Sequence, residues 1–255
     1  MQEVRIRHFS RFCRGLAFAS LACLASCSKN EPTKETSAPA PTASTPPAAS
    51  AAKPDAPRLE IFIDAASATV FGERFDGALP DMKGRLGAAL ARPHAEGDPT
   101  VAATRDAKVP LVATVLTALG ESKMTGVRVK TVRRDGVTAE LPFALGRRRP
   151  DCATVGFIGK DGAIAVWPSS GGTAQRFSRG LAGPDLTRGS EGVKRAMAAC
   201  ESPLWAVSAD DAVTWGLVAD LVIAVTSAEA GAPRARELVL LAHAPVPGRR
   251  VPETD

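Results

Sequence analysis

The sequence has no tyrosine, only three histidines, and 5% aromatic residues in 255 positions. A nucleic-acid-binding surface interleaves basic with aromatic side chains, so this scarcity argues against a nucleic-acid partner. Neither a Cys-x-x-Cys nor a His-x-x-x-His spacing occurs, which removes the usual sequence signs of a zinc site. We therefore expect no metal, no cofactor and no bound nucleic acid.

Long apolar runs are also lacking. The apolar stretch at residues 16–25 is too short to cross the roughly 30 Å of hydrocarbon in a bilayer. A basic leader precedes it, with arginines at Arg5, Arg7, Arg11 and Arg14. Small residues follow it, and this order is that of a secretory signal. We therefore expect residues 1–26 to be a signal peptide and the rest of the chain to work outside the cytoplasm.

The signal ends in Leu24-Ala25-Ser26-Cys27. This run resembles the lipobox of bacterial lipoproteins, over four residues with the expected flanks. The resemblance implies cleavage between Ser26 and Cys27, acylation of Cys27, and anchoring in a lipid bilayer through that residue. Ser28 stands where an aspartate retains enteric lipoproteins in the inner membrane, which favours the outer membrane, facing the periplasm. The alternative is an ordinary signal peptide, cut near Ala25, that leaves Cys27 as a free thiol.

The positive charge of the chain belongs largely to the leader. Residues 1–26 carry four arginines and one glutamate, a net +3 of the chain's +5, which leaves +2 for the mature chain. The densest basic run that remains is Arg147-Arg148-Arg149. Such a run is more typical of a solvated turn between domains than of a binding patch.

Proline, alanine, serine and threonine dominate residues 28–57. This composition cannot bury enough apolar surface to offset the entropy of ordering, so we expect a disordered tether over 27–57. Thirty residues reach about 30 Å as a coil and up to about 90 Å as extended polyproline II. The tether is therefore long enough to hold a domain clear of a lipid surface.

Two segments with similar hydrophobic patterns follow, at 58–146 and 151–245. The first shows strand periodicity at 59–63, 68–71, 100–103, 127–132 and 137–143, and helical periodicity from 80 to 90 and from 109 to 119. The second shows strands at 154–158, 163–167, 204–207 and 237–243, and helices at 193–199 and 213–225. Thr187 or Ser190 is the expected cap of the helix at 193–199.

The order of elements recurs with a period of about 100 residues, which favours an internal duplication. We predict an α+β fold of two tandem β-β-α-β-α-β units, each a small mixed sheet with two helices on one face. The units meet near residues 146–150, and residues 246–255 form a disordered tail.

The most specific motif lies where the third strand of each half leads into the second helix. The second half carries Ala209-Asp210-Asp211-Ala212-Val213-Thr214-Trp215-Gly216, and the first half carries Asp106-Ala107-Lys108-Val109-Pro110. Asp106 and Asp210 precede their helices, where a carboxylate can accept backbone N–H bonds and face the positive end of the helix dipole. Pro110 suits a first helical turn, and Trp215 is expected to pack over the sheet.

These segments resemble the periplasmic domain of the ExbD/TolR biopolymer-transport family, whose pattern is Ala-Asp, two variable residues, Val-Pro-Tyr-Gly and an apolar helix. The matching residues are Asp210, Val213, Trp215 and Gly216 in the second half, and Asp106, Val109 and Pro110 in the first. The first half lacks the aromatic–glycine pair. The resemblance covers nearly all of 59–132 and, more loosely, 154–243, and implies a periplasmic binding domain. The family's membrane helix, whose aspartate takes part in proton-driven work, is replaced here by the lipid anchor and tether, so energy coupling is not implied.

Cleavage of the signal removes Cys13 and Cys23, and lipid occupies Cys27, which leaves Cys152 and Cys200. In an oxidising compartment these two thiols are candidates for a disulfide. They precede the first and third strands of the second unit, so parallel pairing of those strands would bring their Cα atoms within the roughly 4.4–6.8 Å that a bridge needs. Two unrelated buried thiols are the alternative, because the strand order does not follow from the sequence.

Catalytic signatures are weak. Gly189-Ser190-Glu191-Gly192 has Arg188 where a nucleophile elbow needs glycine, and Ser169-Ser170-Gly171-Gly172 lacks the lysine of a phosphate loop. A Ser-His-Asp site would rest on His94 or His243. We therefore expect not an enzyme but an envelope-anchored binding or scaffold lipoprotein, accessory to biopolymer transport or envelope integrity. Its partner is an envelope protein or peptidoglycan, and a homodimer stays open. The alternatives are an envelope-acting hydrolase and a domain pair used for assembly only.

Overall fold

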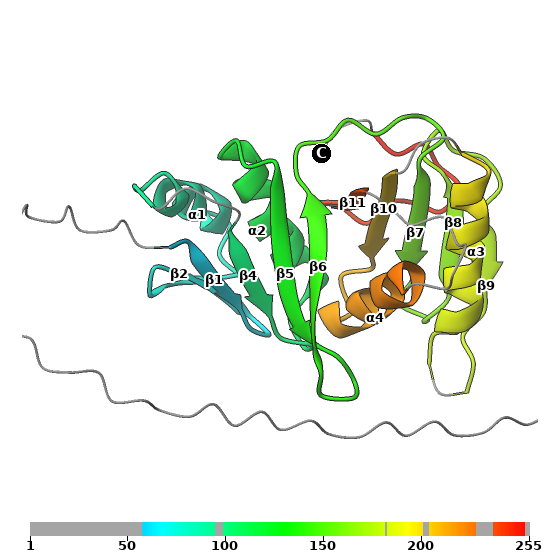
Figure 1. The fold of residues 1–255 in the computed structure, drawn as a ribbon, viewed down its shortest axis with the longest axis horizontal. Coiled ribbons are helices and arrows are strands. Elements are labelled where there is room, and N and C mark those ends of the chain that lie inside the picture. The colour runs from blue at the N-terminus through cyan, green and yellow to red at the C-terminus, as the bar shows by residue number, and fades with distance from the viewer. Residues whose placement is uncertain (1–57, 95–98, 182, 201–203, 228–236, 253–255) are drawn as a thin grey trace, which may run out of the picture. The chain divides into compact units, whose positions relative to one another are not determined.

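The computed structural model describes residues 58–94, 99–181, 183–200, 204–227 and 237–252. The predicted signal peptide, Cys27 and tether lie outside these residues. The described part holds four helices and two mixed sheets, so the chain is α+β, as predicted (Figure 1). No helix in this part has the length and apolar character that a membrane span requires.

The first sheet has six strands in the order β3-β2-β1-β4-β5-β6. The strands are β1 (Glu60–Ile63), β2 (Ser67–Val70), β3 (Glu73–Asp76), β4 (Thr100–Ala103), β5 (Gly126–Val132) and β6 (Thr138–Ala144). Helix α1 (Met82–Leu90) connects β3 to β4, and α2 (Val109–Glu121) connects β4 to β5. The central strands β1, β4 and β5 are parallel, and β2, β3 and β6 are antiparallel additions.

The second sheet has five strands in the order β11-β10-β7-β8-β9. Its elements are β7 (Thr154–Ile158), β8 (Ile164–Pro168), β9 (Gln175–Phe177), α3 (Leu186–Ala198), β10 (Leu204–Ala209), α4 (Trp215–Thr226) and β11 (Glu237–Leu240). From β9 to β11, the strands repeat the order and directions of the first five strands of the other sheet.

Each half begins with three antiparallel strands, where we predicted two. The added strands, β3 and β9, are short edge strands. Phe75 is the single fully buried residue of β3, and β9 has none. Strands with so few inward-facing apolar residues leave almost no period-two pattern in a sequence, so periodicity did not reveal them.

One hydrophobic core runs through both halves, from Leu59 to Leu240. The join is visible at Trp215 of α4, which is fully buried and packs against Phe143 of β6 with ring centroids 5.8 Å apart. An aromatic pair of this kind adds to the stabilisation by apolar burial. The predicted boundary near 146–150 therefore marks the connection between the halves but does not separate two independent cores.

The sheets differ in how their outer faces, away from the helices, are covered. In β1, exposed and buried residues alternate, and Phe62 on the outer face is 48% exposed. In β7 every residue is buried. The cover of β7 comes from residues 241–252, which we call the C-terminal strap; its Leu241 and Val251 are buried with β7 and β8 residues.

Residues 246–252 of the strap fall in the segment that we expected to be a disordered tail. In the structure, Val251 N–H donates to the backbone oxygen of Ser169 at 2.8 Å, and Trp167 Nε1 donates to the oxygen of Arg249 at 2.9 Å. The expectation is wrong for this part, because proline and arginine suggest a solvated tail whereas the sheet supplies backbone partners and an apolar surface.

Helix α3 begins earlier than predicted. Its N-cap is Asp185, whose Oδ1 accepts the N–H of Arg188 at 3.1 Å. Thr187 and Ser190, the predicted caps, lie inside the helix, so that prediction is wrong. Leu186 is the one large apolar residue in the first two turns, which bury Gly189 and Gly192 instead, and this hid the helical periodicity. A Cβ on Gly189 would lie only 2.4 Å from a side-chain carbon of Ile164, so this glycine lets the helix approach the sheet closely.

Candidate functional site

The loops that precede α2 and α4 pair with each other. Lys108 and Thr214, each the residue immediately before its helix, form an antiparallel bridge. Trp215 N–H donates to the oxygen of Ala107, and Gly216 N–H to the oxygen of Arg105, both at 2.8 Å. The two motif segments therefore lie against each other where the halves meet.

The backbone corrects how the two motifs align. We equated Asp106 with Asp210. In the structure, Ala107 N–H donates to the oxygen of Thr104 at 3.2 Å, and the same turn recurs as Val213 N–H to the oxygen of Asp210 at 2.8 Å. Thr104, not Asp106, is therefore the counterpart of Asp210, and the sequence alignment was shifted by two residues.

Neither aspartate caps a helix. Oδ1 of Asp210 accepts the N–H of Ala212 at 3.0 Å within its turn, and Asp106 is exposed in the other turn. The N-cap positions belong to Lys108 and Thr214, neither of which makes a side-chain capping bond. The predicted capping role of Asp106 and Asp210 is wrong, because both carboxylates stand before the cap position.

The other motif residues serve packing. Val109 and Trp215 are buried, and Pro110 lies in the first turn of α2, as predicted. A Cβ on Gly216 would lie 2.9 Å from the backbone oxygen of Arg105. The close approach of the two loops therefore requires glycine at this position.

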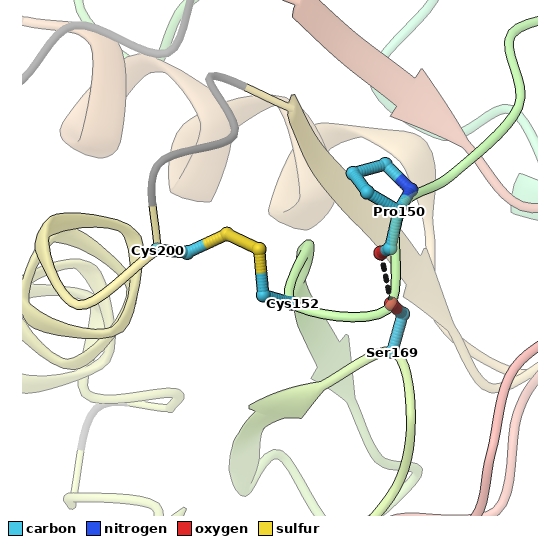
Figure 2. Close-up of a disulfide and its surroundings, with 4 residues drawn as sticks. All are labelled: Pro150, Cys152, Ser169 and Cys200. Carbon is cyan, nitrogen blue, oxygen red and sulfur yellow. Dashed lines mark hydrogen bonds between the residues drawn. A yellow bond between two sulfur atoms is a disulfide. The ribbon is translucent and has the colours of Figure 1, made fainter.

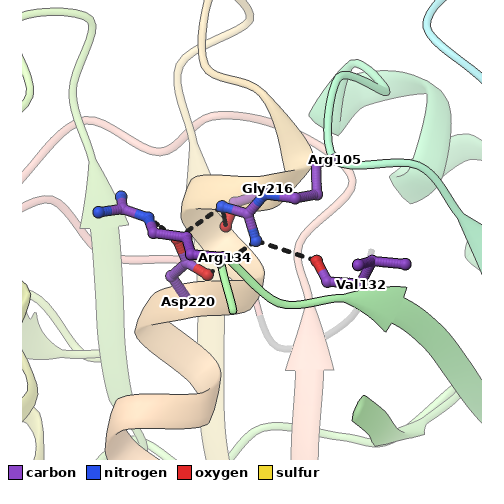
Figure 3. Close-up of polar contacts among 5 residues, drawn as sticks. All are labelled: Arg105, Val132, Arg134, Gly216 and Asp220. Atoms are coloured by element: carbon purple, nitrogen blue, oxygen red, sulfur yellow. Dashed lines mark hydrogen bonds and ion pairs between the residues drawn. The ribbon is translucent and has the colours of Figure 1, made fainter. Parts of the chain in front are cut away.

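Asp220 of α4 binds two arginines from the first half (Figure 3). Arg105 donates to Oδ1 at 2.9 Å and to Oδ2 at 2.7 Å, and Nε of Arg134 donates to Oδ2 at 2.7 Å. Arg105 also donates to the backbone oxygens of Val132 and Gly216. The hydrogen bonds to Asp220 raise the pKa of Arg105. The Asp220 side chain is 10% exposed and that of Arg105 is 30% exposed, so the cluster is a partly buried tie between the halves.

Cys152 and Cys200 form a disulfide with a Cα–Cα distance of 5.6 Å (Figure 2). Cys152 precedes β7, Cys200 precedes β10, and these strands pair in parallel. The prediction required this parallel pairing to bring the two cysteines within bridging distance. Oγ of Ser169 donates to the backbone oxygen of Pro150 at 2.6 Å, which fixes the turn that leads to Cys152.

The arginine run 147–149 is built into the connection between the halves. Arg147 is exposed and lies 3.7 Å from Glu237. Arg149 is only 2% exposed, and its Nε donates to the backbone oxygen of Pro252 at 3.0 Å. The prediction of a solvated turn is therefore wrong for Arg149, because the C-terminal strap ends against it. A pocket of about 270 Å³ lies between this turn, the end of α2 and β11.

The outer face of the first sheet carries a larger hollow, of about 590 Å³. Phe62 and Phe71 provide its aromatic lining, and Thr69 and Thr100 provide hydroxyl groups. Arg58, the first described residue, lies at its rim. The hollow therefore combines aromatic carbon with hydroxyl groups on one face of the sheet.

The two histidines of the described part do not share a site. His94 follows α1, with Nδ1 2.8 Å from the backbone oxygen of Arg92. His243 lies in the C-terminal strap, where its backbone oxygen, not its ring, accepts a bond from Ser208 Oγ at 3.3 Å. Within the described ranges, no group of three or more His, Cys, Asp or Glu side chains is placed to hold a metal ion.

Comparison of the chain with protein-family models, with curated proteins and with solved structures finds no match.

Proposed function

We propose that this chain is an envelope-anchored binding or scaffold protein. Acylated Cys27 holds it in the outer membrane, and residues 28–57 tether the folded part in the periplasm. The folded part offers the outer face of its first sheet to an envelope protein or peptidoglycan, in a role accessory to biopolymer transport or envelope integrity.

The unequal cover of the two sheets carries this proposal. The C-terminal strap closes the outer face of the second sheet, whereas Phe62 on the first sheet is 48% exposed beside a hollow of about 590 Å³. A large aromatic side chain in a hollow with a polar rim is typical of a surface that a partner covers. The arginine–aspartate cluster, by contrast, has its charges engaged with one another and is best explained by stability.

We also propose that the two halves are tandem copies of one ExbD/TolR-like unit. Support comes from the shared strand order and from matching backbone bonds: Thr104 N–H donates to Ile63 and Asp210 N–H to Ile158, both at 2.9 Å. The bridge between Lys108 and Thr214 joins equivalent positions, as contacts do across a two-fold axis. The fused pair thus supplies internally the contact that a single unit would make as a homodimer.

A photoreactive amino acid at position 62, in intact cells, tests the binding function. The matched control carries the same group at Val137, an apolar residue that is 55% exposed in the turn between β5 and β6. We expect a discrete adduct from position 62 that is lost with Cys27→Ala, and none from position 137. The absence of an adduct at position 62, or identical adducts from both positions, would contradict the proposal.

A further inference from the structure

The pairing of strands places Phe62 and Phe157 at the same position of their sheets. Phe62 lies opposite Ala102, one residue before the end of β4, and Phe157 lies opposite Ser208, one residue before the end of β10. Phe62 is 48% exposed, whereas Phe157 is 8% exposed. The same surface position is therefore open in one sheet and covered in the other.

The correspondence extends to the next strand. Val70 of β2 and Val166 of β8 each pair with the residue that precedes the phenylalanine of the neighbouring strand. The residues that follow these valines, Phe71 and Trp167, therefore also correspond. Trp167 is 1% exposed beneath the C-terminal strap, and Phe71 lines the hollow. Two aromatic positions are thus shared between the hollow and the surface that the strap covers.

The strap shows how this kind of surface holds a segment of chain. Its aliphatic side chains, Leu241 and Val251, are buried against the sheet. Its backbone oxygens accept bonds from side chains of the sheet, with Trp167 Nε1 bound to Arg249 and Ser208 Oγ bound to His243. The first residue of the strap, Leu241, still donates its N–H to the backbone oxygen of Val207 in β10 and so continues the pairing of β11. Prolines occupy three of the later positions and cannot donate to a strand ladder, and beyond Leu241 the strap crosses the face without extending the sheet. Aromatic-lined grooves bind extended proline-containing peptides in this way.

The hollow has the same means of recognition. Phe62 and Phe71 supply the aromatic surface, and the hydroxyls of Thr69 and Thr100 lie where they can donate to backbone oxygens of a bound segment. The chain's own residues 28–57 are a poor occupant, since they contain no leucine, valine, isoleucine, methionine or aromatic residue to match Leu241 and Val251.

We propose that the hollow binds an extended, proline-containing peptide segment of an envelope protein, anchored by an aliphatic side chain at Phe62. This assignment rests on the proposed binding function and names the class of partner. It selects a polypeptide over peptidoglycan, because the covered counterpart of the hollow holds polypeptide through carbonyl oxygens and aliphatic anchors.

The test uses a fluorescent synthetic peptide with the sequence of the strap, residues 241–252, titrated against the purified chain carrying Cys27→Ala. We expect saturable binding by fluorescence polarisation. Phe62→Ser should weaken it about tenfold or more, because it removes a half-exposed aromatic contact. Val137→Ser, which changes an exposed apolar residue outside the hollow, should leave the affinity within about twofold.

Three results overturn the assignment. The first is the absence of binding at about 1 mM peptide, a concentration at which even a weak complex would form. The second is binding whose affinity Phe62→Ser leaves unchanged. The third is binding that appears only after deletion of residues 28–57, because the tether would then be the occupant of the hollow. A negative titration together with a specific adduct from position 62 in cells would reject the peptide class and retain the binding function. Failure of both experiments would reject the function itself.

Discussion

Replacement of Asp220 by asparagine tests whether the charge cluster ties the two halves together. The substitution keeps the shape of the side chain and removes the charge that Arg105 and Arg134 share. Breaking a fully buried ion pair costs about 3–5 kcal/mol, and an exposed pair contributes about 0–1 kcal/mol. Asp220 is 10% exposed, but Arg105 and Arg134 are 30% and 59% exposed, so solvent screens the pairs in part. We therefore expect a loss of about 2 kcal/mol.

The matched control is Glu73→Gln, which weakens the pair between Glu73 and Arg92. That pair has nearly the same separation, 2.8 Å, but its side chains are 39% and 54% exposed. Urea unfolding followed by far-ultraviolet circular dichroism measures both variants. With a slope of about 2 kcal/mol per molar, Asp220→Asn should lower the midpoint by about 1 M and the control by less than about half as much. Equal shifts for the two variants would refute the tie between the halves.

Three further predictions concern stability. Joint replacement of Cys152 and Cys200 by serine opens a 48-residue loop and should cost about 4 kcal/mol, seen as a lower urea midpoint; an unchanged midpoint would contradict a structural bridge. Gly216→Ala places a methyl group against the facing backbone and should cost about 1–3 kcal/mol, whereas Gly87→Ala, in an open helical position, should be neutral or stabilising in the same assay. Hydrogen bonds within its turn, chiefly the one from the backbone N–H of Ala66, hold the pKa of Asp64 below its usual value. The stabilisation by this carboxylate is therefore present above about pH 4 and is lost as the pH falls through the folded pKa. The unfolding free energies of wild type and Asp64→Asn should converge in acid, and a difference that stays constant with pH would contradict this.

Local patterns in the sequence predicted local structure well. The strands at 100–103 and 154–158 were predicted with their observed bounds, and Asp135-Gly136, a dipeptide typical of hairpin turns, forms the turn between β5 and β6 with a φ of 81° at the glycine. The sequence made the disulfide a candidate by placing both cysteines just before strands, and the structure confirms it by pairing β7 with β10 in parallel. The two strands and the hairpin turn depend on patterns within a few residues, whereas the disulfide depends on the pairing of two strands.

The junction between the halves was not predicted, because its contacts are distant in the chain. Arg105 and Asp220 are separated by 115 residues, and neither was singled out as a motif residue. One signal was present: Asp220 is the only charged residue of the apolar helix α4, and a carboxylate in such a helix needs a cationic partner. The ordered C-terminal strap was not predicted for a related reason. Its conformation depends on contacts with a sheet that is distant in the chain, and the local sequence does not reveal them.

Hydroxyl-radical footprinting of Phe62 and Phe157 tests the proposed binding face most directly. The two phenylalanines hold equivalent positions, and their exposures are 48% and 8%. In the purified protein we predict strong oxidation of Phe62 and weak oxidation of Phe157. In intact cell envelopes we predict that Phe62 becomes as protected as Phe157. Equal oxidation of Phe62 in both preparations, or protection of Phe62 already in the purified protein, would contradict a face that is free in the isolated chain and covered by a partner in the envelope.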